Sequence, residues 1–142
     1  MNYYLDTNIF LYAADPQSEF HAVAAKVLEF VVEGKITGVT STETFQEIIY
    51  VGQRGKRLKE ALHIFDQAFT LLDVVLPIAH AELARFRVLA ESYPMLEGRD
   101  LLHAAAAISA GVMQLISYDT DFDRIKEIQR VTPEVLIAVV EG

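Results

Sequence analysis

Carboxylate side chains, spread over most of the chain, are the groups whose type and setting could carry chemistry. Asp6 and Asp119 each end a short apolar run, while Glu47 and Asp100 lie in helical segments. Acids that would repel one another in a bare cluster can converge where hard cations neutralise them, and oxygen ligands suit Mg²⁺ or Mn²⁺. The four acids therefore predict a catalytic site for one of these ions, with Asp121 as an accessory ligand.

The setting of these acids predicts that they meet at one edge of a sheet. Ligands of open parallel sheets bind outside the carboxyl ends of the strands, where Asp6 and Asp119 are expected. Asp100 is expected in the first turn of its helix, where the helix dipole favours a negative charge. An Asp after a strand is often only a helix cap, so that alternative stays open for Asp6. Asp121 likewise remains a rival to Asp119.

Two glutamates compete for the helical position of the site. Thr40-Ser41-Thr42-Glu43 fits a capping box, which would already engage Glu43 at the helix start. Glu47 lies four residues later on the same helix face and has no such local partner. Glu47 is therefore the better candidate.

Strand-like and helical segments alternate along the chain, which is typical of a parallel sheet covered on both faces. The expected strands are 2–6, 36–39, 71–76, 114–118 and 128–131. The expected helical segments are 7–14 (capped by Thr7 or Asn8), 18–33, 40–51, 57–69, 78–92 (with Pro77 in its first turn), 99–110 and 122–127. A short helix after Pro133 is favoured for the C-terminal segment, although β-branched residues leave a strand as the alternative.

The bulk composition restricts the class of protein. A length of 142 residues suits one domain, residues 1–142, and the lack of cysteine excludes disulfides and thiolate metal sites. No signal peptide and no run of membrane-spanning length is recognised, so a cytoplasmic protein is expected. A hydrophobic fraction of 52% is consistent with an oligomer or a partner-covered surface, and an Ala- and Val-rich core is the alternative. The net charge of −8 argues against non-specific coating of nucleic acid, but not against an enzyme whose acids bind cations.

Four motifs, in this order, resemble those of the PIN-domain ribonucleases and, among them, the VapC-type toxin nucleases. The motifs are Leu5-Asp6-Thr7-Asn8, Phe45-Gln46-Glu47-Ile48, Arg99-Asp100-Leu101-Leu102-His103-Ala104-Ala105 and Ser117-Tyr118-Asp119-Thr120-Asp121-Phe122. Ser117 stands where the family more often has Thr, a change that keeps the hydroxyl. Each motif alone is weak, whereas all four at family-like spacing are a strong signal.

This resemblance implies a fold, an activity and partners. It implies a three-layer α/β/α sandwich around a parallel sheet of order 3-2-1-4-5. It implies Mg²⁺- or Mn²⁺-dependent cleavage of single-stranded RNA by a homodimer, which a small antitoxin protein would block. Thr7, Asn8 and Ser117 would then orient the metal-binding carboxylates.

Several other polar residues have less certain roles from sequence. Arg54, Lys56 and Arg57 form a basic patch that could contact RNA phosphates, and Arg99 could do the same beside Asp100. For the patch of Arg54, Lys56 and Arg57, a solvated turn is the favoured interpretation. His103, one turn after Asp100, is expected to be a helix-surface or core-edge histidine more than a site residue.

Two other functions remain open from the sequence. One is a phosphohydrolase with a strand-end Asp nucleophile, but that chemistry usually has a second Asp two residues on, where this chain has Asn8. The other is a non-catalytic PIN-like module that binds RNA or a partner. The presence of all four acids argues against it.

Overall fold

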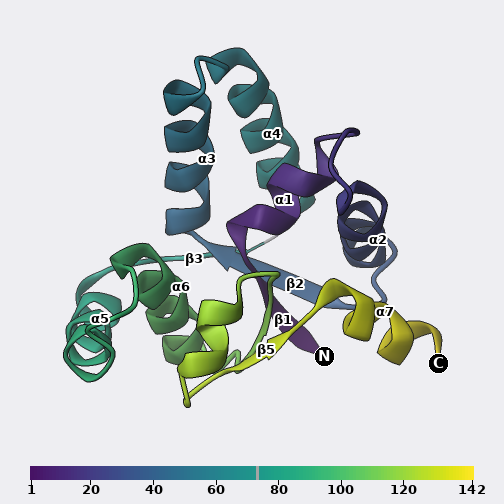
Figure 1. Ribbon diagram of the computed structural model, residues 1–142. Coiled ribbons are helices and arrows are strands. Elements are labelled where there is room, and N and C mark those ends of the chain that lie inside the picture. The colour runs from purple at the N-terminus through teal and green to yellow at the C-terminus, as the bar shows by residue number, and fades with distance from the viewer. Residues whose placement is uncertain (73) are drawn as a thin grey trace.

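The computed structural model describes residues 1–72 and 74–142 of the chain (Figure 1). Its strands are β1 (Asn2–Leu5), β2 (Thr37–Ser41), β3 (Val75–Leu76), β4 (Gln114–Ile116) and β5 (Gln129–Val131). Its helices are α1 (Thr7–Ala13), α2 (His21–Val32), α3 (Thr42–Arg54), α4 (Leu58–Leu71), α5 (His80–Ser92), α6 (Gly98–Ser109) and α7 (Pro133–Glu141), with a 3-10 helix η1 (Thr120–Arg124).

Within the described residues the strands form one five-stranded sheet of order β3-β2-β1-β4-β5, and every pairing is parallel. The predicted order 3-2-1-4-5 is confirmed. Tyr4 of β1 lies opposite Val39 of β2 on one side and Leu115 of β4 on the other. The carboxyl ends of all strands therefore open onto one edge of the sheet, and the change of direction in strand order falls beside β1.

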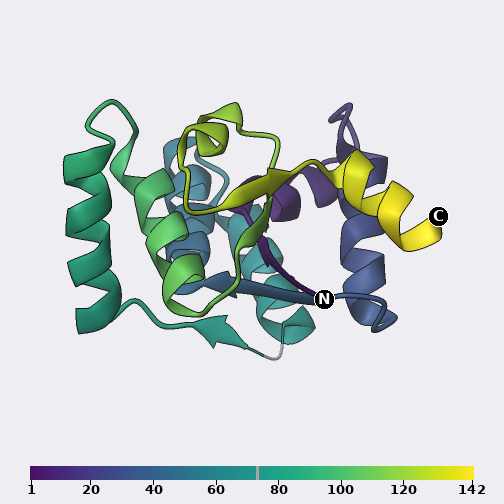
Figure 2. The same ribbon diagram turned by 90° about the horizontal axis from the view of Figure 1, so that it is seen from below.

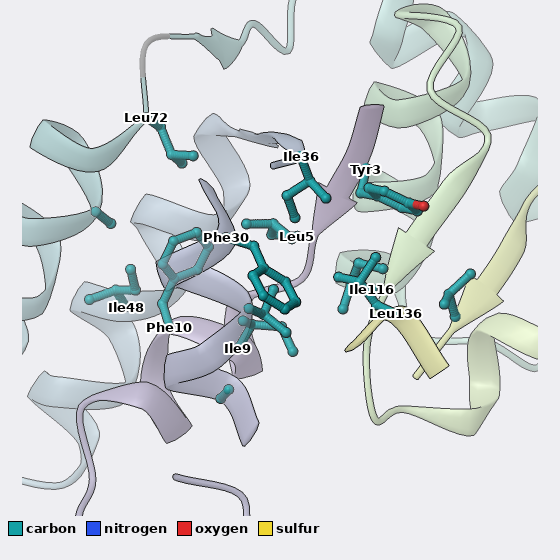
Figure 3. Packing of buried hydrophobic residues seen from close by; sticks show 14 of the residues in the cluster. Tyr3, Leu5, Ile9, Phe10, Phe30, Ile36, Ile48, Leu72, Ile116 and Leu136 are labelled. Carbon is teal, nitrogen blue, oxygen red and sulfur yellow. The ribbon is translucent and has the colours of Figure 1, made fainter. Parts of the chain in front are cut away.

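Alternating side chains of the central strand divide the core into two layers. Tyr3 and Leu5 point into the cluster with Phe30 of α2 and Ile48 of α3, whose packing Figure 3 shows. Tyr4 points to the opposite face, among the alanines of α6. Figure 2 shows α5 and α6 on one side of the sheet and α2 and α7 on the other. The predicted α/β/α sandwich is confirmed.

The start of α3 corrects the predicted capping box. The N-cap is Ser41, without a side-chain cap hydrogen bond, and Thr40 still belongs to β2. The Thr40 hydroxyl donates to the carbonyl of Leu5 at 2.8 Å and is hydrogen-bonded to Thr44. Because this buried hydroxyl satisfies a strand carbonyl, it does not cap the helix, and Glu43 has no capping role.

The segment between α4 and α5 also differs from the prediction. The strand expected over 71–76 is reduced to Val75–Leu76, because α4 continues to Leu71; position 73 lies outside the described residues. This strand is half-buried at the sheet edge. Helix α5 begins at His80, where Glu82 accepts a hydrogen bond from the Ala79 amide, so Pro77 precedes the helix.

Helices α1 and α2 start differently from the prediction, whereas the C-terminal segment is helical as predicted. Asp6, not Thr7 or Asn8, caps α1. Ser18 accepts from the Phe20 amide in a turn before α2 and is not its N-cap. The C-terminal helix is confirmed as α7. No helix in the described part of the chain is long and apolar enough to cross a membrane.

Candidate metal centre

An acidic pocket of about 240 Å³ opens at the carboxyl edge of the sheet, beside the end of β1. All five predicted acids line it, although they come from positions far apart in the sequence. The lining residues are Asp6, Thr7, Asn8, Leu11, Glu47, Glu97, Arg99, Asp100, Asp119 and Asp121. The parallel strand arrangement is what brings β1 and the segment after β4 together here.

Three of these acids lie close enough together to share an ion. One carboxylate oxygen from each of Asp100, Asp119 and Asp121 lies within 4.8 Å of the other two. Asp100 is 8% exposed and lies in the first turn of α6. Asp119 caps η1 by accepting from the Asp121 amide at 2.9 Å, and this tight turn turns both acids toward the pocket. Asp121, predicted as an accessory ligand, is thus a full member of the group.

Asp6 is held by its neighbours and is only 6% exposed. One carboxylate oxygen accepts from the Thr7 amide at 2.8 Å, and the other accepts from the Ser117 hydroxyl at 2.6 Å. The Ser117 hydroxyl in turn accepts from the Asn8 side chain and from the Asp119 amide. The helix-cap and site interpretations of Asp6 are therefore compatible, since its caps leave it beside the pocket.

Glu47, which lines the pocket and is partly buried, is paired with the buried His103 beside Asp6. The His103 Nε2 donates to Glu47 Oε1 and lies 3.6 Å from Asp6 Oδ1. The Thr7 hydroxyl donates to the same Glu47 oxygen at 3.1 Å.

Of the positions that the sequence left open for His103, the structure excludes the helix surface. The residue is 1% exposed and belongs to the site, not to the helix surface. Its spacing of three residues from Asp100 on an alanine-rich helix is the signal that could have found it, because small residues allow α6 to pack close to the sheet.

The electrostatics of the pocket change several pKa values. Burial, together with the neighbouring Asp119 and Asp6, raises the pKa of Asp100 to about 7. Burial also raises the pKa of Asp6. Burial opposes ionisation of Glu47 as well, but the hydrogen bonds from His103 and Thr7 outweigh it and lower the pKa. Without a metal ion, the pocket therefore favours an additional proton on its acids.

Buried His103 has a pKa well above its usual value. Burial acts to lower this pKa, whereas Tyr4 and the carboxylates of Glu47 and Asp6 raise it more strongly. A positive charge on the imidazole partly offsets the negative charge of the acids around it.

The residues of the pocket fit a hard divalent cation. Asp100, Asp119 and Asp121 offer only oxygen atoms, which Mg²⁺ and Mn²⁺ prefer. Asn8 Oδ1, which belongs to a residue lining the same pocket, is a buried acceptor without a hydrogen-bond partner among the described residues. The raised pKa of Asp100 is also what a cation would reverse.

The four basic residues predicted to contact RNA lie in two separate places. Arg99 lines the pocket and forms an ion pair with Glu97 at 2.8 Å. Arg54 lies seven residues after Glu47, which is about 10 Å along the helix axis, and its guanidinium lies over the Tyr50 ring. Lys56 and Arg57 follow in the turn between α3 and α4. The structure therefore brings Arg99 to the pocket and leaves the other three in a separate patch.

The chain resembles known proteins of one family. The chain matches the PIN domain family over residues 3–128. It is 30% identical to ribonuclease VapC13 of Mycobacterium tuberculosis over 126 residues, covering 89% of this chain and 96% of that protein. It is 32% identical to ribonuclease VapC23 of the same species over 123 residues, covering 82% of this chain and 91% of that protein.

Solved structures show the same fold at low sequence identity. VapBC2 from Rickettsia felis, bound to a DNA fragment from its promoter, aligns with a TM-score of 0.73 at 22% identity, over 93% of this chain and 98% of that one. VapBC-1 from nontypeable Haemophilus influenzae aligns with a TM-score of 0.70 at 20% identity, over 94% and 99%. Fold and site define an α/β protein with an acidic strand-end pocket. The chain belongs to the PIN domain family.

Proposed function

We propose that this protein is a metal-dependent endoribonuclease that cleaves single-stranded RNA, and that it is the toxin of a toxin–antitoxin pair. The observation that carries the proposal is the convergence of Asp6, Glu47, Asp100, Asp119 and Asp121 on one pocket at the carboxyl edge of the sheet. The curated relatives named ribonuclease support the substrate class.

Asp100, Asp119 and Asp121 would hold the metal ion, and Asp6 would lie beside it in the lining of the same pocket. A bound Mg²⁺ or Mn²⁺ would supply positive charge that neutralises these acids and stabilises the charge developing on the phosphate. Ser117, Thr7 and Asn8 orient the carboxylates through the hydrogen bonds described above.

The protein's own groups would complete the reaction. Glu47 lines the pocket but is not part of the Asp100, Asp119 and Asp121 group, and its carboxylate is an acceptor that can take the proton of an attacking water. Arg99 at the pocket rim would contact a phosphate of the bound strand once its ion pair with Glu97 opens. Arg54, Lys56 and Arg57 would contact phosphates farther along the RNA.

The alternative of an aspartyl nucleophile is disfavoured by the surroundings of Asp6. Both of its carboxylate oxygens accept hydrogen bonds, and the residue is almost fully buried. A nucleophile needs an oxygen free to attack in line with the leaving group. A non-catalytic module remains the other alternative, and the cleavage experiment below distinguishes it from a nuclease.

We also propose two partners in the cytoplasm, where RNA is present. A small antitoxin protein is suggested by the VapBC complexes, and a second copy of this chain is implied by the resemblance to the PIN-domain toxin nucleases. Because the pocket is strongly anionic, the antitoxin would insert a basic side chain among the acids. A structure of the complex with these carboxylates free of basic contacts would contradict that part of the proposal.

Cleavage of a mixed single-stranded RNA, and of the same RNA in a duplex, tests the activity. We expect cleavage of the single strand with Mg²⁺ or Mn²⁺ and none with EDTA. Asp119→Asn should lower the rate by more than about 100-fold, since even loss of a residue behind a metal ligand costs 10–100-fold. Asp66→Asn, on the exposed face of α4, is the control and should cleave normally. Metal-independent cleavage, or full activity of Asp119→Asn, would overturn the proposal.

A further inference from the structure

A chain of buried polar groups runs from the sheet to Glu47. The Ser41 and Tyr4 hydroxyls are hydrogen-bonded at 2.7 Å, and the Tyr4 hydroxyl lies 2.5 Å from Nδ1 of His103. The other ring nitrogen of His103 donates to Glu47. Four separate elements, β2, β1, α6 and α3, therefore contribute one link each.

Both ring nitrogens of His103 are engaged, which fixes the orientation of the imidazole. The ring is also packed edge-on against Tyr4, with the ring centroids 5.6 Å apart. The neighbours of His103 on α6 are fully buried alanines, where an aliphatic side chain would pack without any need for partners. The polar side chain at this position is explained by its hydrogen bond to the Glu47 carboxylate.

Glu47 needs such support more than Asp6 does. Asp6 is short and is fixed by a backbone amide and by Ser117. Glu47 has a longer side chain, with more rotatable bonds, and among the described residues its carboxylate accepts hydrogen bonds only from the Thr7 hydroxyl and His103. Without His103, Glu47 is free to turn toward the Asp100 group or toward solvent.

We propose that His103 is a positioning residue, which holds the Glu47 carboxylate at the pocket wall and apart from the Asp100, Asp119 and Asp121 group, while Tyr4 and Ser41 hold His103 in turn. This inference rests on the proposed function, because it concerns the group that accepts a proton in RNA cleavage. It predicts that different residues hold the two parts of the pocket, the part that binds the ion and the part that contains Glu47.

The test compares His103→Leu, which keeps the volume but removes the donor, with His103→Gln, whose amide can still donate to Glu47. We expect His103→Leu to lower kcat by about 10–100-fold, with KM and Mn²⁺ affinity changed less than about threefold. His103→Gln should recover most of the lost kcat. Tyr4→Phe, which frees Nδ1 of the ring, should give a smaller loss. His63→Leu, on the exposed face of α4, is the control.

Thermal unfolding of each variant separates positioning from simple loss of the fold. An NMR readout that needs no activity accompanies it: the side-chain carboxyl ¹³C signal of Glu47, with Mg²⁺, should shift in His103→Leu and return in His103→Gln. Equal kcat losses in folded His103→Leu and His103→Gln would overturn the inference, as would an unchanged Glu47 signal. If the parent protein cleaves no RNA, the proposed function fails. The Glu47 signal alone then tests whether His103 positions the Glu47 carboxylate.

Discussion

The acids of the pocket serve local structure and the site at the same time. Asp6 caps α1 and Asp119 caps η1, yet both line the pocket. Capping fixes the carboxylates in place, since a cap requires one rotamer. Burial of Asp100, together with the charges of the neighbouring Asp119 and Asp6, raises its pKa to about 7.

The raised pKa of Asp100 predicts how stability depends on pH in the metal-free protein. Its ordinary value is 3.8, so between about pH 4 and pH 7 the folded protein keeps a proton that the unfolded chain has released. This contribution to stability is present at low pH and is lost as the pH rises through 7. Asp100→Asn should therefore be about 1–2 kcal/mol more stable than the parent at pH 8 in EDTA.

Urea unfolding at pH 5, 6, 7 and 8 measures this effect. Mg²⁺ should stabilise the parent at pH 8 and have little effect on Asp100→Asn. Asp66→Asn serves as a matched control, because it removes an exposed acid and should keep the pH dependence of the parent. If the free energy of unfolding of Asp100→Asn depended on pH as that of the parent does, the raised pKa of Asp100 would not contribute to stability.

At the scale of elements, the site depends on how α3 is held, because α3 carries Glu47. Helices α3 and α4 run side by side in Figure 1 and come close at Gly52. A Cβ atom built at Gly52 would lie 2.3 Å from the Cβ of Ala61 and 3.2 Å from the carbonyl oxygen of Arg57. The close approach of the two helices thus requires glycine on one and alanine on the other.

Gly52→Ala should therefore force α4 away from α3 and lower the free energy of unfolding by about 1–3 kcal/mol. Chemical denaturation of purified protein measures it. Gly55→Ala is the matched control, because its Cβ would meet no atom closer than 3.4 Å and its φ of −86° suits alanine. That variant should be neutral or slightly stabilised. Equal effects of the two substitutions would contradict the packing argument.

At the scale of the whole molecule, helix α4 carries a regular row of partly exposed apolar side chains. Leu58, Leu62, Phe65 and Phe69 are spaced at i, i+4, i+7 and i+11, so they share one face of the helix. Leu62 is 47% and Phe69 64% exposed. Such a stripe can pair with its own copy across a two-fold axis, which suits the proposed homodimer.

The double variant Leu62→Glu, Phe69→Glu should shift the protein from dimer to monomer, with its helical content retained. Sedimentation equilibrium measures the mass, and circular dichroism checks the fold. Val88→Glu, on an exposed position of α5, is the control and should leave the mass unchanged. A dimeric double variant would place the interface elsewhere, and a monomeric parent would exclude the homodimer.

Much of the fold was determined by the sequence alone. Apolar spacing of 3.6 residues marks the helices, and short β-prone runs mark the strands, so the alternation of the two could be predicted. The sheet order followed from the resemblance of the four motifs to those of the PIN-domain ribonucleases. Glycines at Gly34 and Gly111 follow helix ends with positive φ. The order and identity of Asp6, Glu47, Asp100 and Asp119 were likewise enough to predict that they would meet.

Only the tertiary structure decided the local partners. Thr40 could cap α3 by its sequence, but a carbonyl of the neighbouring strand takes its hydroxyl. His103 could have faced solvent, but close packing of α6 encloses it between Tyr4 and Glu47. Hydrogen-bond partners that lie 35 to 99 positions apart leave no local pattern, because a buried polar group takes whichever partner the fold brings near.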